Sequence, residues 1–100
     1  MIPAVPIYVT LMKFTSHGMT GIPAWRDRVE EAERAIEARG GRFIDAYVTL
    51  GRYDVVEIFE APDDETAYQI LIEVAKHGQV TTETLRAFTR EEAERIVKGS

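Results

Sequence analysis

The sequence predicts an α+β domain, a ferredoxin-like βαββαβ sandwich followed by a short C-terminal helix. Two runs of β-branched and aromatic residues, 43–50 and 53–61, flank Gly51-Arg52 in mid-chain. A helical pattern of apolar residues precedes and follows this pair, and a strand pattern stands outside each helix. The order strand-helix-strand-strand-helix-strand is that of the split βαβ motif. We therefore expect two helices on one face of an antiparallel sheet.

Length and composition restrict the classes of protein to consider. One hundred residues make one domain, 1–100, of which 45% are hydrophobic and 29% charged. The net charge of -5 and the lack of a basic cluster argue against a nucleic-acid partner. The absence of cysteine excludes disulfides and thiolate metal sites. No apolar run approaches the roughly 20 residues of a membrane span, so we expect a soluble cytoplasmic protein without a membrane partner.

The first half of the chain reads as a strand and a helix. Residues 7–14 are apolar on both alternating faces, which is typical of a central strand. A loop follows at 15–22, and Pro23 suits the first turn of a helix. Trp25, Val29, Ala32 and Ile36 recur at helical spacing. Gly40-Gly41 is expected to end this helix with a left-handed residue.

The central runs predict a β-hairpin. Gly51-Arg52 fits a two-residue type II′ turn, in which Gly51 has a positive φ. The pairs Val48/Val55 through Ile44/Phe59 follow from this turn. The side expected toward the helices carries Ile44, Ala46, Val48, Leu50, Tyr53, Val55, Glu57 and Phe59. Glu57 is its only charge and leaves open the alternative of a one-residue slip, which would exchange the two sides. The other side carries Phe43, Asp45, Tyr47, Thr49, Asp54, Val56, Ile58 and Glu60, and it is too apolar to be left in water.

The second half predicts a helix, a strand and a last helix. Asp63 or Asp64 is expected to cap a helix that ends near Lys76-His77-Gly78. Residues 79–88 read as the fourth strand. Thr89-Arg90-Glu91-Glu92 is a capping box that opens a short helix through Val97.

Several segments resemble the GYD domain family. They are Tyr8-Val9-Thr10-Leu11 with Phe14-Thr15, then Gly51-Arg52-Tyr53-Asp54, then Glu60-Ala61-Pro62-Asp63-Asp64, and finally residues 78–88. The resemblance covers nearly the whole chain and implies a fold of the dimeric α/β-barrel kind. It supplies no catalytic residue. A more distant resemblance, through the turn and the last strand, is to the effector-binding domain of leucine-responsive and asparagine-type regulators.

Five residues are candidates for a ligand site. Tyr8, Tyr47 and Tyr53 offer an apolar ring and a hydrogen-bond donor, and they suit either a pocket or an interface. His17 and Asp54 suit a general base, although a loop histidine and a carboxylate that supports the turn are the simpler interpretations. No metal or cofactor is expected, since the two histidines lack ligand spacing. His77 and the acidic residues 63–65 are better explained as helix ends.

The main functional hypothesis is a homodimer, or higher homo-oligomer, that holds a small metabolite. Its cavity would lie at the open sheet face or between subunits. One alternative is an enzyme of the dimeric α/β-barrel monooxygenase or isomerase type, with His17 or Asp54 as base. Another is a structural or regulatory assembly module without a ligand. The reason to expect a dimer is that two helices cover only one face of a sheet whose other face is also apolar.

Overall fold

The computed structural model describes residues 5–16 and 25–99. Its strands are β1 (Ile7–Phe14), β2 (Arg42–Val48), β3 (Val55–Glu60) and β4 (Val80–Ala87). Its helices are α2 (Trp25–Ala38), α3 (Asp64–Ala75) and α4 (Arg90–Lys98). The sheet is antiparallel throughout, in the order β2-β3-β1-β4. The predicted α+β ferredoxin-like βαββαβ fold with a C-terminal helix is therefore confirmed.

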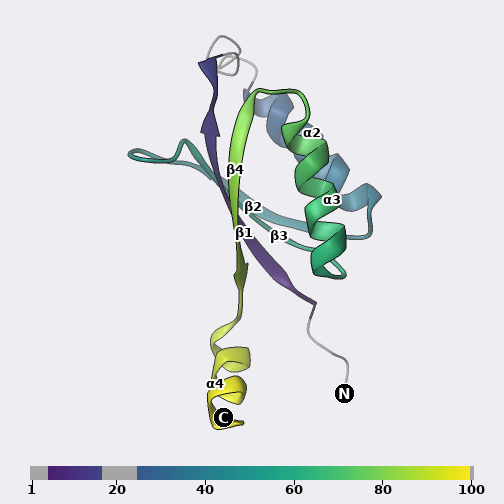
Figure 1. The fold of residues 1–100 in the computed structure, drawn as a ribbon, viewed down its shortest axis with the longest axis vertical. Helices are drawn as coiled ribbons and strands as arrows, with labels where there is room; N and C mark the ends of the chain where they lie inside the picture. Colours follow the sequence, from purple (N-terminus) through teal and green to yellow (C-terminus); the bar gives the residue numbers. More distant parts are fainter. Residues whose placement is uncertain (1–4, 17–24, 100) are drawn as a thin grey trace.

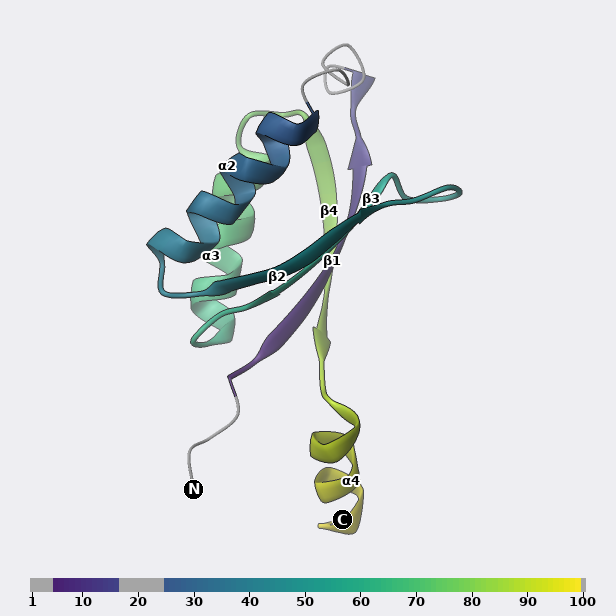
Figure 2. The ribbon, with the colours of Figure 1, turned by 180° about the vertical axis from the view of Figure 1, so that it is seen from behind.

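Helices α2 and α3 lie side by side on one face of the sheet (Figures 1 and 2). We call this face the helix side and the opposite one the open side. The tip of the β2–β3 hairpin extends away from the helices, and α4 stands beyond the end of β4 (Figure 1). Within the described residues, nothing covers the open side (Figure 2).

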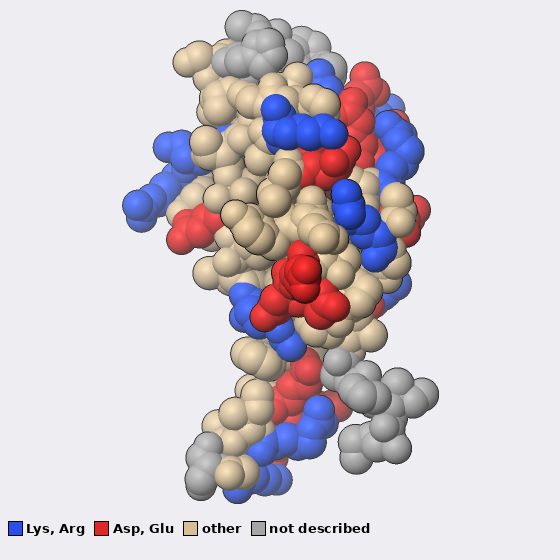
Figure 3. Space-filling model, turned by 45° about the vertical axis from the view of Figure 1, so that its right-hand side comes forward, with Lys and Arg blue, Asp and Glu red and all other residues tan. Residues whose placement is uncertain are grey.

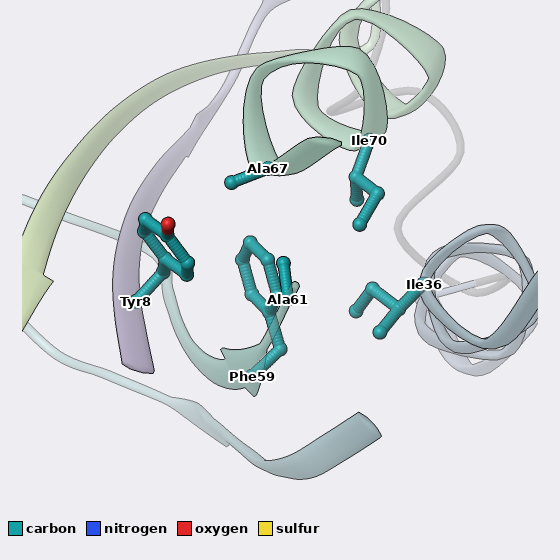
Figure 4. Close-up of a cluster of buried hydrophobic side chains, with 6 residues drawn as sticks. All are labelled: Tyr8, Ile36, Phe59, Ala61, Ala67 and Ile70. Carbon is teal, nitrogen blue, oxygen red and sulfur yellow. The ribbon is translucent and has the colours of Figure 1, made fainter. Parts of the chain in front are cut away.

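The hydrophobic core lies between the helix side and the two helices. Tyr8, Phe59 and Ala61 point from the sheet toward Ile36 of α2 and toward Ala67 and Ile70 of α3 (Figure 4). The rings of Tyr8 and Phe59 stack with their centroids 5.4 Å apart. Burial of these apolar side chains is the main favourable contribution to folding. Because β1 lies inside the sheet, its prediction as a central strand is confirmed.

Helices α2 and α3 end and begin as their sequences indicate. The N–H groups of Gly40 and Gly41 donate to the carbonyls of Glu37 and Ile36, 3.1 and 2.9 Å away, with Gly40 at φ 81°. These are the two bonds of a Schellman motif. At the start of α3, the Asp63 carboxylate accepts the Thr66 N–H at 2.7 Å. Asp63 is therefore the cap, and the Asp64 side chain is left for another contact.

The hairpin register is confirmed near the turn and wrong at the far end. The pairs Val48↔Val55 through Asp45↔Ile58 are as predicted, but Phe43, rather than Ile44, lies opposite Phe59. The cause is a β-bulge between Phe43 and Asp45. Its extra residue exchanges the sides of the sheet on which the preceding residues of β2 lie. Phe43 consequently packs against the core, and Ile44 is exposed. The strands also end sooner than predicted, because Thr49–Asp54 form the turn.

Helix α4 has the predicted capping box. Thr89 Oγ1 accepts the Glu92 N–H at 3.1 Å, and Glu92 Oε1 accepts the Thr89 N–H at 2.8 Å. None of its residues is buried. Among the described helices, none is long and apolar enough to cross a bilayer.

Candidate functional site: a pocket between the helices and the sheet

A pocket of about 560 Å³ lies on the helix side of the sheet. Its base is formed by Met12 and Phe14 of β1, Val55 and Glu57 of β3, and Val80 of β4. Its walls are α2, from Arg28 to Arg39, and the C-terminal end of α3. The volume falls within the usual range of small-molecule sites, roughly 300–1,000 Å³.

Glu57 is the unusual residue of this pocket. Its side chain projects from the middle of β3 toward the helices, and the residue is only 2% exposed. Neither a hydrogen bond nor an ion pair is found for its carboxyl group within the described chain. Burial, assisted by the negative charge of Glu33 on α2, raises the pKa of Glu57 from 4.5 to about 7. At neutral pH this carboxyl group is thus close to half protonated.

A row of polar side chains crosses the sheet at the level of Glu57. Thr10 of β1 lies opposite Glu57, and Thr84 of β4 lies opposite Thr10. The two threonine hydroxyls are 2.9 Å apart and share a hydrogen bond, and Thr10 is completely buried. The threonines satisfy each other, and Glu57 lines the pocket.

Charged side chains of both signs surround the pocket mouth. Figure 3 shows lysine, arginine and acidic side chains interspersed with other residues on the side toward which the helices face. Arg28 pairs with Glu31 at 3.1 Å, and Glu73 pairs with Lys76 at 2.8 Å. These pairs are exposed and individually contribute little to stability, but they set the charge that an entering molecule meets.

Tyr8 and Asp54 have structural partners. Tyr8 lies in the core, 4% exposed, and its phenol donates to the Asp64 carboxylate at 2.5 Å. Burial first, and this hydrogen bond second, raise the pKa of Tyr8 to about 12. Asp54 accepts the Phe14 N–H at 2.8 Å, so its carboxylate ties the hairpin to β1. Neither residue lines the pocket.

The other predicted site residues do not converge either. Tyr47 lies on the open side, 54% exposed, and a hydrogen bond to Asp45 raises its pKa. Strand alternation predicts Tyr53 on the helix side, but its phenol donates to Glu83, whose position on β4 is on the open side. Leu50, predicted to share that side, is fully exposed. Both lie in the turn, where strand alternation no longer applies. His17 lies outside the described residues.

Sequence reasoning missed the pocket but recorded its main signal. Glu57 is the only charge on the side predicted to face the helices, and the structure confirms that it faces them. A charge within an apolar strand face is costly unless it is paired or useful. The other pocket residues carry no comparable signal, because the helical stripe that includes Val29 and Ala32 is what an ordinary core helix shows.

The open side of the sheet is a second candidate surface. Its centre is apolar and half-buried, with Val9 and Leu11 of β1 beside Ile58 and Val56 of β3. Leu85 of β4 extends it and is 49% exposed. An apolar area of this kind is typical of a contact surface.

Fold and pocket together define a small α+β domain with a ferredoxin-like sheet and a helix-side pocket. The chain belongs to the GYD domain family, whose model matches residues 8–97. A curated relative, the "Glutamine synthetase and cystathionine beta-lyase binding protein" of Thermus thermophilus, is 31% identical over 84 residues. That match covers 83% of this chain and 88% of the relative.

Solved structures agree on the fold. The crystal structure of MtbAldR superposes with a TM-score of 0.64 at 15% identity; the match covers 90% of this chain but only 59% of MtbAldR. The crystal structure of a Thermus thermophilus protein gives a TM-score of 0.53 at 22% identity and covers 84% of this chain and 94% of that one. At these identities the likeness concerns the fold alone.

Proposed function

We propose that this chain is a small-molecule-binding domain whose ligand occupies the helix-side pocket, and that two copies associate through their open sheet sides. The observation that carries the proposal is the buried carboxyl group of Glu57, which has no partner among the described residues, at the base of a pocket of about 560 Å³. Ligand sites typically combine apolar side chains with placed polar groups, and here Glu57 lies among Met12, Val55 and Val80 of the sheet.

The pocket modifies the ligand site expected from the sequence. The cavity supported by the geometry lies within one protomer, between α2, α3 and the sheet, rather than at the open side. Tyr47 and Tyr53, on the open side, then serve as contacts between copies. Tyr8 and Asp54 support the pocket from outside by holding α3 and the hairpin in place.

Native mass spectrometry of freshly purified protein tests ligand retention and assembly together. We expect a dimer with a small molecule retained by each chain. Ala35 lines the pocket and is half-buried, so Ala35→Phe should fill the pocket and abolish retention. Ala93→Phe, the same change on exposed α4, should leave retention unchanged. Equal retention by both variants would place the ligand elsewhere.

A second candidate function is protein binding. The apolar open side favours it, and the Thermus thermophilus relative is named for binding two enzymes. On this view the open side docks on a glutamine synthetase or a cystathionine beta-lyase instead of on a second copy. Sedimentation of mixtures of this chain with each purified enzyme tests the idea. Co-sedimentation with wild type that is lost with Ile58→Lys supports it, and independent sedimentation of the components rejects it.

A further inference from the structure

We propose that the base of the pocket binds an organic cation, an alkyl- or arylammonium group that pairs with Glu57. This inference rests on the proposed function of the pocket and specifies its ligand class. It arises from the almost completely buried carboxyl group of Glu57, which lines the pocket beside apolar side chains and has no positive partner among the described residues.

The state of Glu57 is the first argument. The carboxyl group is almost completely removed from bulk water, yet its oxygens have no hydrogen-bond donor among the described residues. The described chain also contains no fully buried side-chain oxygen without a partner. Glu57 lines the pocket, so a molecule bound there can contact its carboxyl group.

The position of Glu33 is the second argument. Glu33 lies on α2 and is half-buried, although it does not itself line the pocket. Its negative charge disfavours ionisation of Glu57. A cation bound at Glu57 offsets this repulsion, and its attraction is strengthened by the low dielectric of the site.

The described cations that line the pocket are paired with other groups or exposed. Arg28 and Glu31 pair with each other, Arg39 donates to Gln69 at 3.4 Å, and Glu73 pairs with Lys76. From α2, Arg34 also lines the pocket, and from beyond the end of α3 His77 does so, but both are exposed. None of these cations contributes to the pKa of Glu57, whereas Glu33 does.

The rest of the lining indicates the remainder of the ligand. Met12, Phe14, Val29, Val55 and Val80 provide apolar walls beside Glu57. An ammonium group with an attached hydrocarbon chain or ring satisfies both parts. A metal ion fits less well, because no described group of three or more His, Asp or Glu side chains is arranged to hold one.

Binding of a cation should be coupled to the release of a proton. The ligand pairs with ionised Glu57, and this form increases as the pH rises through about 7. The apparent affinity is scaled by the ionised fraction, so it should increase about tenfold between pH 6 and pH 8. A neutral ligand that accepts a hydrogen bond from protonated Glu57 would show the opposite trend.

Titration of the ¹⁵N-labelled full chain with n-hexylammonium, 1-hexanol and hexanoate, followed by NMR at pH 6 and pH 8, tests the proposal. We expect n-hexylammonium to shift the amide signals of Ala35, Val55 and Glu57, with about tenfold tighter binding at pH 8. Glu57→Gln should weaken this binding at least tenfold and remove its pH dependence. Glu30→Gln, which removes an exposed carboxylate from the same α2, should behave as wild type.

The three probes distinguish a failure of the cation inference from a failure of the proposed function of the pocket. Pocket shifts from 1-hexanol as large as those from n-hexylammonium, without pH dependence, would overturn the cation inference and leave the pocket a ligand site. Preference for hexanoate would do the same. If none of the probes shifts pocket signals, both the cation inference and the proposed function lose their support.

Discussion

At the scale of single residues, Gly51 determines how the chain reverses between β2 and β3. Its φ is 113°, a conformation that side-chain-bearing residues rarely adopt. An added Cβ would meet no atom within 4 Å. The requirement for glycine is therefore one of backbone conformation rather than space.

Substitution of this glycine should accordingly be destabilising. We expect Gly51→Val to lower the free energy of unfolding by roughly 1–3 kcal/mol, the usual cost of a disfavoured backbone conformation. Chemical denaturation of both proteins measures the difference. Arg52→Val, at the next exposed position, is the control. Equal stability of Gly51→Val and wild type would show that the turn relaxes without cost.

Glu57 should make stability depend on pH in the opposite direction to an ordinary paired carboxylate. Its pKa is about 7 in the folded chain against 4.5 for a free side chain. Below pH 4.5 both states are protonated, and between 4.5 and 7 the unfolded chain loses its proton first. Stability therefore falls as the pH rises through this window, by up to about 3 kcal/mol at about 1.4 kcal/mol per pKa unit.

The variant Glu57→Gln should remove this part of the pH dependence. We expect it to match wild type at about pH 4 and to be more stable at about pH 8, since no buried charge has to form. Denaturation curves at both pH values give the comparison, with Glu30→Gln as the surface control. A variant less stable than wild type at the higher pH would mean that the folded protein benefits from ionised Glu57.

At the scale of elements, local sequence signals fix where α2 ends and where α3 and α4 begin, whereas Pro23, the predicted start of α2, lies outside the described residues. Packing decides which of these helices are stable. Helices α2 and α3 bury side chains against the sheet. Helix α4 buries none and depends on its capping box and on the Lys98–Glu94 pair at 3.1 Å. Isolated helices as short as this one are marginal in water, so the cap carries an unusual share of its stability.

The cap of α4 therefore provides a sensitive test. Thr89→Ala should cost on the order of 1 kcal/mol by leaving N-terminal N–H groups of the helix unsatisfied. The loss should appear as faster amide hydrogen exchange within 90–98, with little effect on the sheet. Thr81→Ala, at an exposed position of β4, is the matched control. Unchanged exchange in α4 would show that contacts beyond this chain hold the helix.

At the scale of the whole molecule, one face of the sheet lacks a cover among the described residues. The described chain extends 48 × 30 × 18 Å, and its radius of gyration of 14.6 Å exceeds the roughly 13 Å of a compact domain of 100 residues. The protruding α4 and the thin, one-sided sandwich account for this shape (Figure 2). A second copy placed about a twofold axis would cover the open side of both chains at once.

Disruption of this face should produce monomers. Ile58 lies half-buried at the centre of the open side, so Ile58→Lys should place an unpaired charge inside the interface. Sedimentation of wild type at micromolar concentration should give twice the mass of the 11.3-kDa chain, and the variant should give that mass once. A stable interface of this kind needs about 1,200 Å² of buried surface or more.

The control for this experiment lies on the opposite layer. Ile72 is 52% exposed on α3, and Ile72→Lys should leave the dimer intact. Monomeric, folded wild-type protein would remove the basis for a dimer through the open side.

The sequence alone determined the order of elements, the cap at Thr89, the positive φ of Gly51 and most of the hairpin register, and it limited the cap of α3 to Asp63 or Asp64. These features depend on neighbours within a few residues, where periodicity and turn chemistry are informative. They were sufficient to predict the fold and to recognise the family. They also identified Glu57 as a charge on a face that should be apolar.

Only the tertiary structure decided where a site can lie. Because of the bulge between Phe43 and Asp45, Phe43 packs against the core in place of Ile44. No glycine stands at these positions to indicate a bulge in the sequence. The pocket forms because the packing of α2 on the sheet places Glu57 of β3 beneath Val29 and Ala35 of α2, which are more than 20 positions away in the sequence. Such a meeting depends on the geometry between elements, and the pattern within each element does not encode it.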